Sequence, residues 1–486
     1  MKRYFFLVIV SLVATEYLAV PMGKLNLEHC HIAKHAQEVL CGSHTVYEDR
    51  AAATGRQIEI KFAVIPSVTE AKEKDPLVML AGGPGQGAKE MGPFVRMAFQ
   101  EIHENRDVVL IDQRGMGSSH PLNCEQPEDL YLTLTEEEQI IQTQQLLQKC
   151  LSDLDADVTK YTQDIANQDI NEILLALGYE KVNLYGVSWG TRSALLYVNQ
   201  FPDHVRTVIV DGNAPPDNKV PLYATEDAEQ SIKALFKDCA DDIECHKAFA
   251  NLEQDFNELL ASFGDMGKKA TVLDANTGKA VSFTLSRSVF VNALRNILYI
   301  PDFSRLIPII IEQAKENNYQ TIAGLTAAFG DGGMAIGATL TILCSEELAR
   351  IAEADIENEK NKGFVAGAFI NNFKNSCSEW PKAPLPEIYN QPLISSVPSL
   401  ILSGAIDPVT PPRWGDKMAE YLTNSKHLIA PNTGHNVAPK GCASKLMAQF
   451  VNQGNFEDID ASCLDNIKRP SFFIDASGPA RSVSHD

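Results

Sequence analysis

Basic residues are in short supply in this chain of 486 residues, in which 42 lysines and arginines stand against 63 aspartates and glutamates, for a formal net charge of -21. No run of five or more like charges occurs, so the sequence has no charged tail. The acidity argues against the phosphate backbone of a nucleic acid or an anionic membrane as a partner. It is compatible with a cationic substrate, although acidity is also a common means of keeping a protein in solution.

Long hydrophobic runs are absent beyond the N-terminus, which argues against a membrane-spanning helix further along. At the N-terminus, Lys2-Arg3 precedes an apolar run from Tyr4 to Ala14 that is too short to span a bilayer, and Glu16 interrupts any longer run. This pattern predicts a signal peptide over 1–23, export to the periplasm or the medium, and no membrane attachment once the signal is removed. The cleavage site is left open between Ala14, Ala19 and Gly23.

The sequence also lacks the residue spacings that are typical of zinc sites and of phosphate-binding loops. The clusters His29-Cys30-His31 with His35, and Cys239…Cys245-His246, do not have the C-x2-C…H-x3-H spacing of a zinc site. The glycine-rich segment 82–87 fits neither a phosphate loop nor a dinucleotide loop. We therefore expect no metal and no cofactor, with metal binding by the two Cys/His clusters as the alternative.

Cysteine, in contrast, is well represented, and an even number of cysteines behind an export signal indicates disulfides. The ten cysteines fall into neighbouring pairs along the chain. We expect each pair to bridge locally: Cys30–Cys41, Cys124–Cys150, Cys239–Cys245, Cys344–Cys377 and Cys442–Cys463.

The pentapeptide Gly186-Val187-Ser188-Trp189-Gly190 is the most informative motif. It follows an apolar, β-prone run at 182–185 and precedes a helical pattern at 193–198. G-x-S-x-G between a strand and a helix is typical of a nucleophile elbow, a sharp turn that exposes the serine hydroxyl. Side chains larger than hydrogen at 186 and 190 would clash with neighbouring elements in such a turn. The alternative is a tight glycine turn with a solvated serine.

Short apolar runs elsewhere also predict strands, and they alternate with helical patterns. This alternation predicts an α/β fold with a mostly parallel, doubly wound sheet. The loops that follow such strands lie at their carboxyl ends, where α/β sheets place their sites. The other predicted strands are 58–66, 77–80, 107–111, 206–210, 397–402 and 427–430.

A long, mostly helical stretch from about residue 222 to 384 interrupts the sheet pattern, with one extended segment at 270–283. Because the sheet pattern returns afterwards, we interpret this stretch as an insertion that forms a cap or lid over the site. An independent domain is the alternative. The predicted organisation is a core over 24–215, a helical cap over 216–390, and the rest of the core with a C-terminal tail over 391–486.

Ser188, Asp407 and His435 occur in the chain order of a nucleophile, an acid and a base in α/β hydrolases, each in a loop after a predicted strand. A serine hydroxyl is a poor nucleophile until a base removes its proton, and His435 would be that base. Asp407 would fix the imidazole tautomer and stabilise its charged form. Asp211, which also ends a strand, is the alternative acid.

Two further loops have predicted roles. The glycine-rich loop after the strand 77–80 would place the main-chain N–H of Gly83, together with that of Trp189, as an oxyanion hole. A plain turn is the alternative. In the loop 112–118 we expect Asp112 and Arg114 to form a structural corner through hydrogen bonds or an ion pair.

These motifs together resemble a known family. GGPG, DQRGMGSS, GVSWGTRSALLY, DGNAPP, SGAIDPVTP and TGH, spread over roughly residues 55 to 470, are similar to secreted α/β hydrolases of the tripeptidyl aminopeptidase and proline iminopeptidase group. The resemblance implies a helical cap before the acid-bearing strand. It also implies cleavage of N-terminal residues or short peptides by a Ser-Asp-His triad. The family loop usually reads HGGPG, and Ala81 replaces its histidine here.

In related peptidases, acidic cap residues hold the free ammonium of the substrate. Within Cys344-Ser345-Glu346-Glu347 the resemblance points to Glu346 first, with Glu347 beside it. The alternative is two solvent-exposed glutamates at a helix start. The expected partner is thus a peptide with a free N-terminus, and the oligomeric state stays open. A carboxylic-ester hydrolase with the same triad, or a catalytically silent binding protein, are the competing functions.

Overall fold

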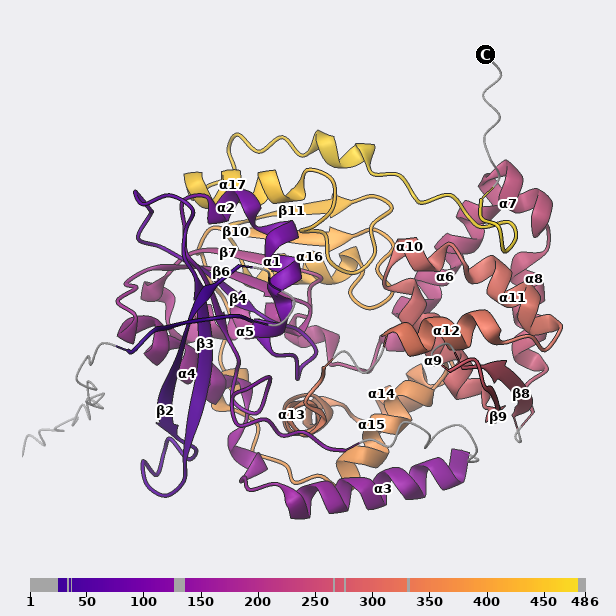
Figure 1. The fold of residues 1–486 in the computed structure, drawn as a ribbon, viewed down its shortest axis with the longest axis horizontal. Helices are drawn as coiled ribbons and strands as arrows, with labels where there is room; N and C mark the ends of the chain where they lie inside the picture. Colours follow the sequence, from indigo (N-terminus) through magenta and orange to yellow (C-terminus); the bar gives the residue numbers. More distant parts are fainter. Residues whose placement is uncertain are drawn as a thin grey trace, which may run out of the picture.

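The computed structural model describes residues 25–32, 35, 37–125, 136–264, 267–274, 277–329 and 333–479. The predicted signal peptide, 1–23, lies outside these residues. A single large sheet organises the rest, with strand order β1-β2-β3-β5-β4-β6-β7-β10-β11 (Figure 1). The strands are β1 Glu28–Cys30, β2 Val39–Tyr47, β3 Gln57–Ile65, β4 Leu77–Leu80, β5 Val108–Ile111, β6 Val182–Val187, β7 Val205–Asp211, β10 Ser399–Gly404 and β11 Ser425–Ala430.

The sheet is mostly parallel, as the alternating pattern predicts. From β5 through β11 every neighbouring pair is parallel, while β1, β2 and β3 add antiparallel pairs at one edge. Every strand predicted from an apolar run is present. β1 and β2 were not predicted, because β2 reads VLCGSHTVY and only two of its nine residues are fully buried. Antiparallel strands near the edge of a sheet lack the continuous apolar run of a central parallel strand.

Helices cover both faces of the sheet, and this explains why β4, β5 and β6 are buried along their whole length. Two apolar clusters result, one on each face of the sheet. On one face pack α4 Gln163–Ala176, α5 Trp189–Gln200 and α16 Pro412–Tyr421, while α3 Glu136–Asp153 packs against α15 Ala368–Glu379 farther from the sheet (Figure 1). On the other face pack α1 Gly92–Ala98, α2 Gln100–His103 and α17 Ala443–Gln453.

Between β7 and β10 the chain leaves the sheet and forms a helical region beside it (Figure 1). Much of this region has an apolar cluster of its own, whereas α13 packs into the core of the sheet. The extended segment expected at 270–283 is an antiparallel hairpin of β8 and β9. The elements are α6 Ala224–Asp241, α7 Ile243–Ala248, α8 Leu252–Ala261, β8 Lys268–Leu273, β9 Ala280–Leu285, α9 Arg287–Leu298, α10 Pro301–Ser304, α11 Ile307–Lys315, α12 Gln320–Phe329, α13 Ile336–Ile342, α14 Glu353–Glu359 and α15 Ala368–Glu379.

The disulfide pairing expected from the sequence is confirmed in full. The bridges join Cys30 to Cys41, Cys124 to Cys150, Cys239 to Cys245, Cys344 to Cys377, and Cys442 to Cys463. The cysteines of both Cys/His clusters are therefore oxidised, which removes their thiolates as ligands for a metal. Across the described ranges, no helix combines the length and the hydropathy needed to cross a membrane.

Candidate active site

Ser188 occupies the turn between β6 and α5 with φ 55° and ψ -122°. This conformation is rare for a residue with a side chain and is typical of strained functional turns. The clash predicted at both glycines is confirmed: a Cβ on Gly186 would lie 2.3 Å from the carbonyl oxygen of Gly190, and one on Gly190 would lie 2.0 Å from that of Leu80. The sequence GVSWG thus forms the tight strand-to-helix turn that it predicts.

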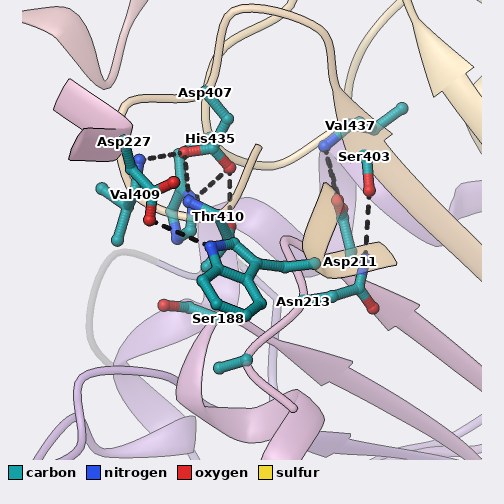
Figure 2. A network of polar contacts seen from close by, with 12 residues as sticks. Ser188, Asp211, Asn213, Asp227, Ser403, Asp407, Val409, Thr410, His435 and Val437 are labelled. Carbon is teal, nitrogen blue, oxygen red and sulfur yellow. Dashed lines mark hydrogen bonds and ion pairs between the residues drawn. The ribbon is translucent and has the colours of Figure 1, made fainter. Parts of the chain in front are cut away.

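Asp407 lies in the turn after β10, and four hydrogen bonds fix its carboxylate. One oxygen accepts the main-chain N–H groups of Val409 and Thr410 at 2.8 and 3.0 Å. The other accepts the Thr410 hydroxyl at 2.7 Å and lies 2.8 Å from Nδ1 of His435 (Figure 2). The structure therefore brings together the acid and the base that the sequence predicts. Thr410 was missed, although its place in the IDPVT turn is a signal for such a contact.

Asp407 and His435 are both buried, and each shifts the pKa of the other. Burial alone would lower the pKa of His435, but the Asp407 carboxylate, together with that of Asp211, outweighs burial and the pKa is raised. Burial alone would raise the pKa of Asp407, but His435 and the Thr410 hydrogen bonds outweigh it and the pKa is lowered. The contact thus favours an imidazolium ion against a carboxylate, which is the charged pair that a general base forms when it takes a proton.

The second ring nitrogen of His435, Nε2, is buried and has no hydrogen-bond partner among the residues described. Ser188 is half-buried and lines a pocket together with Thr410, Gly83 and Trp189. Ser188, Asp407 and His435 follow strands β6, β10 and β11. These strands are parallel and lie close together in the sheet order, so the loops after them share one edge of the sheet. Figure 2 shows Ser188, Asp407 and His435 in this region. The nitrogen that a serine would need is thus the one left unpaired.

Asp211, the alternative acid, has a different set of contacts. Its carboxylate accepts the N–H groups of Val437 and Ala438 at 2.8 Å each and the Tyr185 hydroxyl at 2.8 Å. Burial raises the pKa of Asp211, while these donors act in the opposite direction. It is Asp407, rather than Asp211, that lies in hydrogen-bond contact with the imidazole of His435.

The glycine-rich loop lies against the nucleophile turn. A Cβ on Gly82 would lie 3.0 Å from the Cβ of Ser188, and both Gly83 and Trp189 line the pocket at Ser188. As the first residue of α5, Trp189 has an N–H with no acceptor inside the helix. The loop is also tied to α13, because the Thr339 hydroxyl donates to the Pro84 carbonyl at 2.6 Å. Both predicted oxyanion donors are thus at the pocket.

Glu346 and Glu347 lie in a π-helical turn, Leu343–Glu347, and both are fully buried. The alternative of two solvent-exposed glutamates is therefore wrong. Glu347 pairs with Arg192 at 2.7 Å and accepts the Val220 N–H at 2.7 Å. Neither glutamate is among the residues that line the pocket at Ser188.

Among the described residues, no cation forms an ion pair with the Glu346 carboxylate, although Arg350 donates to the main-chain carbonyl of Glu346 at 2.7 Å. The two carboxylate oxygens accept the main-chain N–H of Gln163 at 2.7 Å and the hydroxyl of Tyr389 at 2.9 Å. Burial raises the pKa of Glu346 to about 8. An ammonium-binding role for Glu346 or Glu347 stays a prediction, and it would require a substrate amine to displace these contacts.

The loop at 112–118 forms the structural corner expected of it. Asp112 accepts the main-chain N–H and the hydroxyl of Ser118 at 2.9 and 2.8 Å. Arg114 is buried and pairs with Asp169 at 2.6 Å. Across the described part of the chain, no group of three or more His, Cys, Asp or Glu is arranged to hold a metal ion.

The sheet order and the serine turn define a class of protein, the α/β hydrolases. The comparison with known families agrees, because the model for the "alpha/beta hydrolase fold" family matches residues 75–441. This chain belongs to that family. Among curated proteins it is 23% identical over 463 residues to "Serine protease Hip1" of Mycobacterium tuberculosis, covering 87% of each chain.

Two other relatives are named as a putative hydrolase and as a peptidase. The chain is 24% identical over 455 residues to "Putative hydrolase YuaR" of Escherichia coli, covering 87% of this chain and 88% of that one. It is 27% identical over 229 residues to "Tripeptidyl aminopeptidase" of Streptomyces lividans, covering 44% and 43%. The protein is therefore a hydrolase of the α/β fold with relatives named as peptidases.

Proposed function

We propose that this protein is an exported serine aminopeptidase that releases N-terminal residues or short peptides from peptides with a free N-terminus. The observation that carries the proposal is the 2.8 Å contact between His435 Nδ1 and Asp407, with Nε2 unpaired and Ser188 in the adjoining pocket. The peptidase names of the relatives support a peptide as the substrate. The disulfides support folding in an oxidising compartment, as export requires.

The proposed mechanism follows from the contacts. Nε2 of His435 takes the proton of the Ser188 hydroxyl as the oxygen attacks the scissile carbonyl, and Asp407 holds Nδ1–H and stabilises the imidazolium. The N–H groups of Gly83 and Trp189 hold the oxyanion, and one such donor is typically worth about 3–4 kcal/mol of barrier. His435 then gives its proton to the leaving amine, and water hydrolyses the acyl-enzyme by the same route.

We further propose that residues 216–390 form a cap on a core made of 24–215 and 391–486. Val220, Arg295 and Phe369, all from this stretch, line the pocket together with Ser188. The cap would therefore supply part of the substrate surface. Such a cap can restrict access so that only a chain end reaches the serine.

A fluorophosphonate probe tests the nucleophile. Wild-type protein should be labelled, Ser188→Ala should not, and Ser378→Ala should be labelled like wild type because Ser378 is exposed and hydrogen-bonds only locally. An unlabelled wild type would favour the catalytically silent alternative.

Paired substrates test the specificity. We expect cleavage of peptide amides with a free N-terminus and little cleavage of the same peptides with a blocked one. Equal cleavage of free and blocked peptides would reject the aminopeptidase proposal. Hydrolysis of simple esters without any peptide cleavage would favour the carboxylic-ester hydrolase.

A further inference from the structure

Arg295 is a buried cation inside the pocket that contains Ser188. It lies on α9, its side chain is 4% exposed, and it lines the pocket with Ser188, Gly83 and Trp189. It is also electrostatically close to the reacting groups, because its charge acts to lower the pKa of His435. A charged side chain in this place faces whatever the pocket binds.

The other buried arginines of this protein have carboxylate partners. Arg114 pairs with Asp169, Arg192 with Glu347, and Arg106 with Asp75. These pairs compensate for the loss of water around each guanidinium group, as burial of a charge requires.

Arg295 has no such partner. Among the described residues, none forms a hydrogen bond or an ion pair with its guanidinium group, and Nε is fully buried without an acceptor. Arg295 lacks a carboxylate partner among the described residues although the protein has a net charge of -21 and 63 aspartates and glutamates, so carboxylates are not scarce.

Aromatic rings hold the guanidinium group in place. It lies 4.5 Å from the ring centroid of Phe369 and 5.5 Å from that of Tyr299. Tyr299 is itself fixed to the loop of His435. Its main-chain carbonyl accepts the main-chain N–H of His435 at 3.0 Å, and its ring packs edge-on against the imidazole with 5.2 Å between the ring centroids. A stacked arginine keeps its planar N–H groups free for a bidentate acceptor, which a carboxylate provides.

We propose that Arg295 binds a carboxylate of the substrate beside Ser188, so that this enzyme prefers peptides that carry a carboxylate close to the scissile bond. The inference rests on the proposed peptidase function and names a substrate class for the same site. The carboxylate can come from a glutamate or aspartate side chain or from the free C-terminus of a short peptide. Both sources offer the same planar anion to the guanidinium group.

Binding to full-length Ser188→Ala protein tests this without catalysis. Calorimetry compares tetrapeptide amides with glutamate or glutamine at each position, and tetra-alanine as the free acid or the amide. We expect the carboxylate member of at least one pair to bind about 10- to 100-fold more tightly, the range for a hydrogen bond to a charged group. The glutamate pairs and the free-acid pair distinguish the two sources.

Substitutions of Arg295 on the same background then assign the preference. Arg295→Met should abolish it while leaving the affinity for the neutral peptides within a few-fold, and Arg295→Lys should keep part of it. Arg305→Met is the matched control, because Arg305 also stacks on a ring, that of Phe473, but lies outside the pocket lining. Circular dichroism confirms that each variant is folded.

Two results would overturn the inference: equal affinity within every acid and neutral pair, or a preference that persists in Arg295→Met. Turnover by the wild type is measured separately. Absence of peptide cleavage rejects the aminopeptidase proposal but still leaves the binding comparison to decide the role of Arg295.

Discussion

The main-chain carbonyl of Asp211 accepts the N–H of Ser188 at 2.9 Å, so the end of β7 is tied to the nucleophile turn. The carboxylate of the same aspartate accepts the N–H groups of Val437 and Ala438, two and three residues after His435 in the chain. One buried residue thus connects the turn of the serine with the loop of the histidine. Its contacts indicate a positioning role, distinct from that of Asp407.

Asp211→Asn should therefore reduce activity less than Asp407→Asn. An asparagine amide presents N–H groups where two main-chain N–H donors now bind, so the loop of His435 should shift. We expect kcat/KM to fall about 10- to 100-fold for Asp211→Asn and about 10⁴-fold for Asp407→Asn, as for triad aspartates. Steady-state kinetics measures both, with Asp217→Asn as an exposed control. Equal losses at 211 and 407 would contradict this assignment.

The pH dependence should follow His435. Under the proposed mechanism only the neutral imidazole takes the serine proton, and Asp407 raises the pKa of His435 above its ordinary value of 6.5. Activity should thus be lost as the pH falls through a midpoint above 6.5. Arg295→Met should move this midpoint to higher pH, because Arg295 acts to lower the pKa of His435. The rate of fluorophosphonate labelling, measured across pH, gives this midpoint. A midpoint below the ordinary histidine pKa would count against the pairing of Asp407 with His435.

Glu346→Gln and Glu347→Gln should have opposite effects on stability. The folded protein keeps the Glu346 proton up to about pH 8, whereas the unfolded chain loses it near 4.5. Wild-type stability is therefore lost relative to Glu346→Gln as the pH rises between these values, at about 1.4 kcal/mol per pH unit. Glu347→Gln breaks a buried ion pair with Arg192 and should cost about 3–5 kcal/mol.

Denaturant unfolding at several pH values checks both substitutions. If Glu346→Gln is no more stable than wild type at high pH, the expectation for Glu346 is contradicted. The same variants test the ammonium role. If Glu346 binds the substrate amine, Glu346→Gln should raise KM for free peptides and leave KM for simple esters unchanged.

The Cys344–Cys377 bridge should contribute more stability than the Cys239–Cys245 bridge. The two bridges span 33 and 6 residues, and chain entropy predicts about 3.7 and 2.2 kcal/mol for loops of these lengths. The first also ties the π-helical turn of Glu346 and Glu347 to α15. Double serine variants of each pair, compared by thermal unfolding, measure the difference, and a larger loss for the shorter loop would refute the entropic argument.

Much of the fold could be predicted because it depends on local patterns. Central parallel strands such as β4 and β5 are continuous apolar runs, and they were found in place. Strand β2, next to the edge strand β1, was missed because its side chains alternate irregularly between partial burial and exposure. The apolar pattern along the chain predicts a strand well where both faces of the strand are covered, and poorly where one face is not.

The candidate site shows the same division. Ser188, Asp407 and His435 could be named from turn chemistry and chain order, since glycines and prolines near them fix the backbone. Arg295 was missed, and its signal in the sequence is a single charge in a mostly apolar helical run, VFVNALRNIL. Whether such a charge reaches solvent, a carboxylate or a pocket depends on helices that pack from elsewhere in the chain.

The sequence by itself predicted the central strands, the strained serine turn and the local disulfide pairs, because steric limits and chain spacing act between near neighbours. Only the tertiary structure decided that Asp407 rather than Asp211 meets His435. Within the described residues it also decided that the buried Glu346 carboxylate forms no ion pair and that Arg295 has no carboxylate partner. Burial and the choice of partner arise from contacts between distant segments, and no local pattern records them.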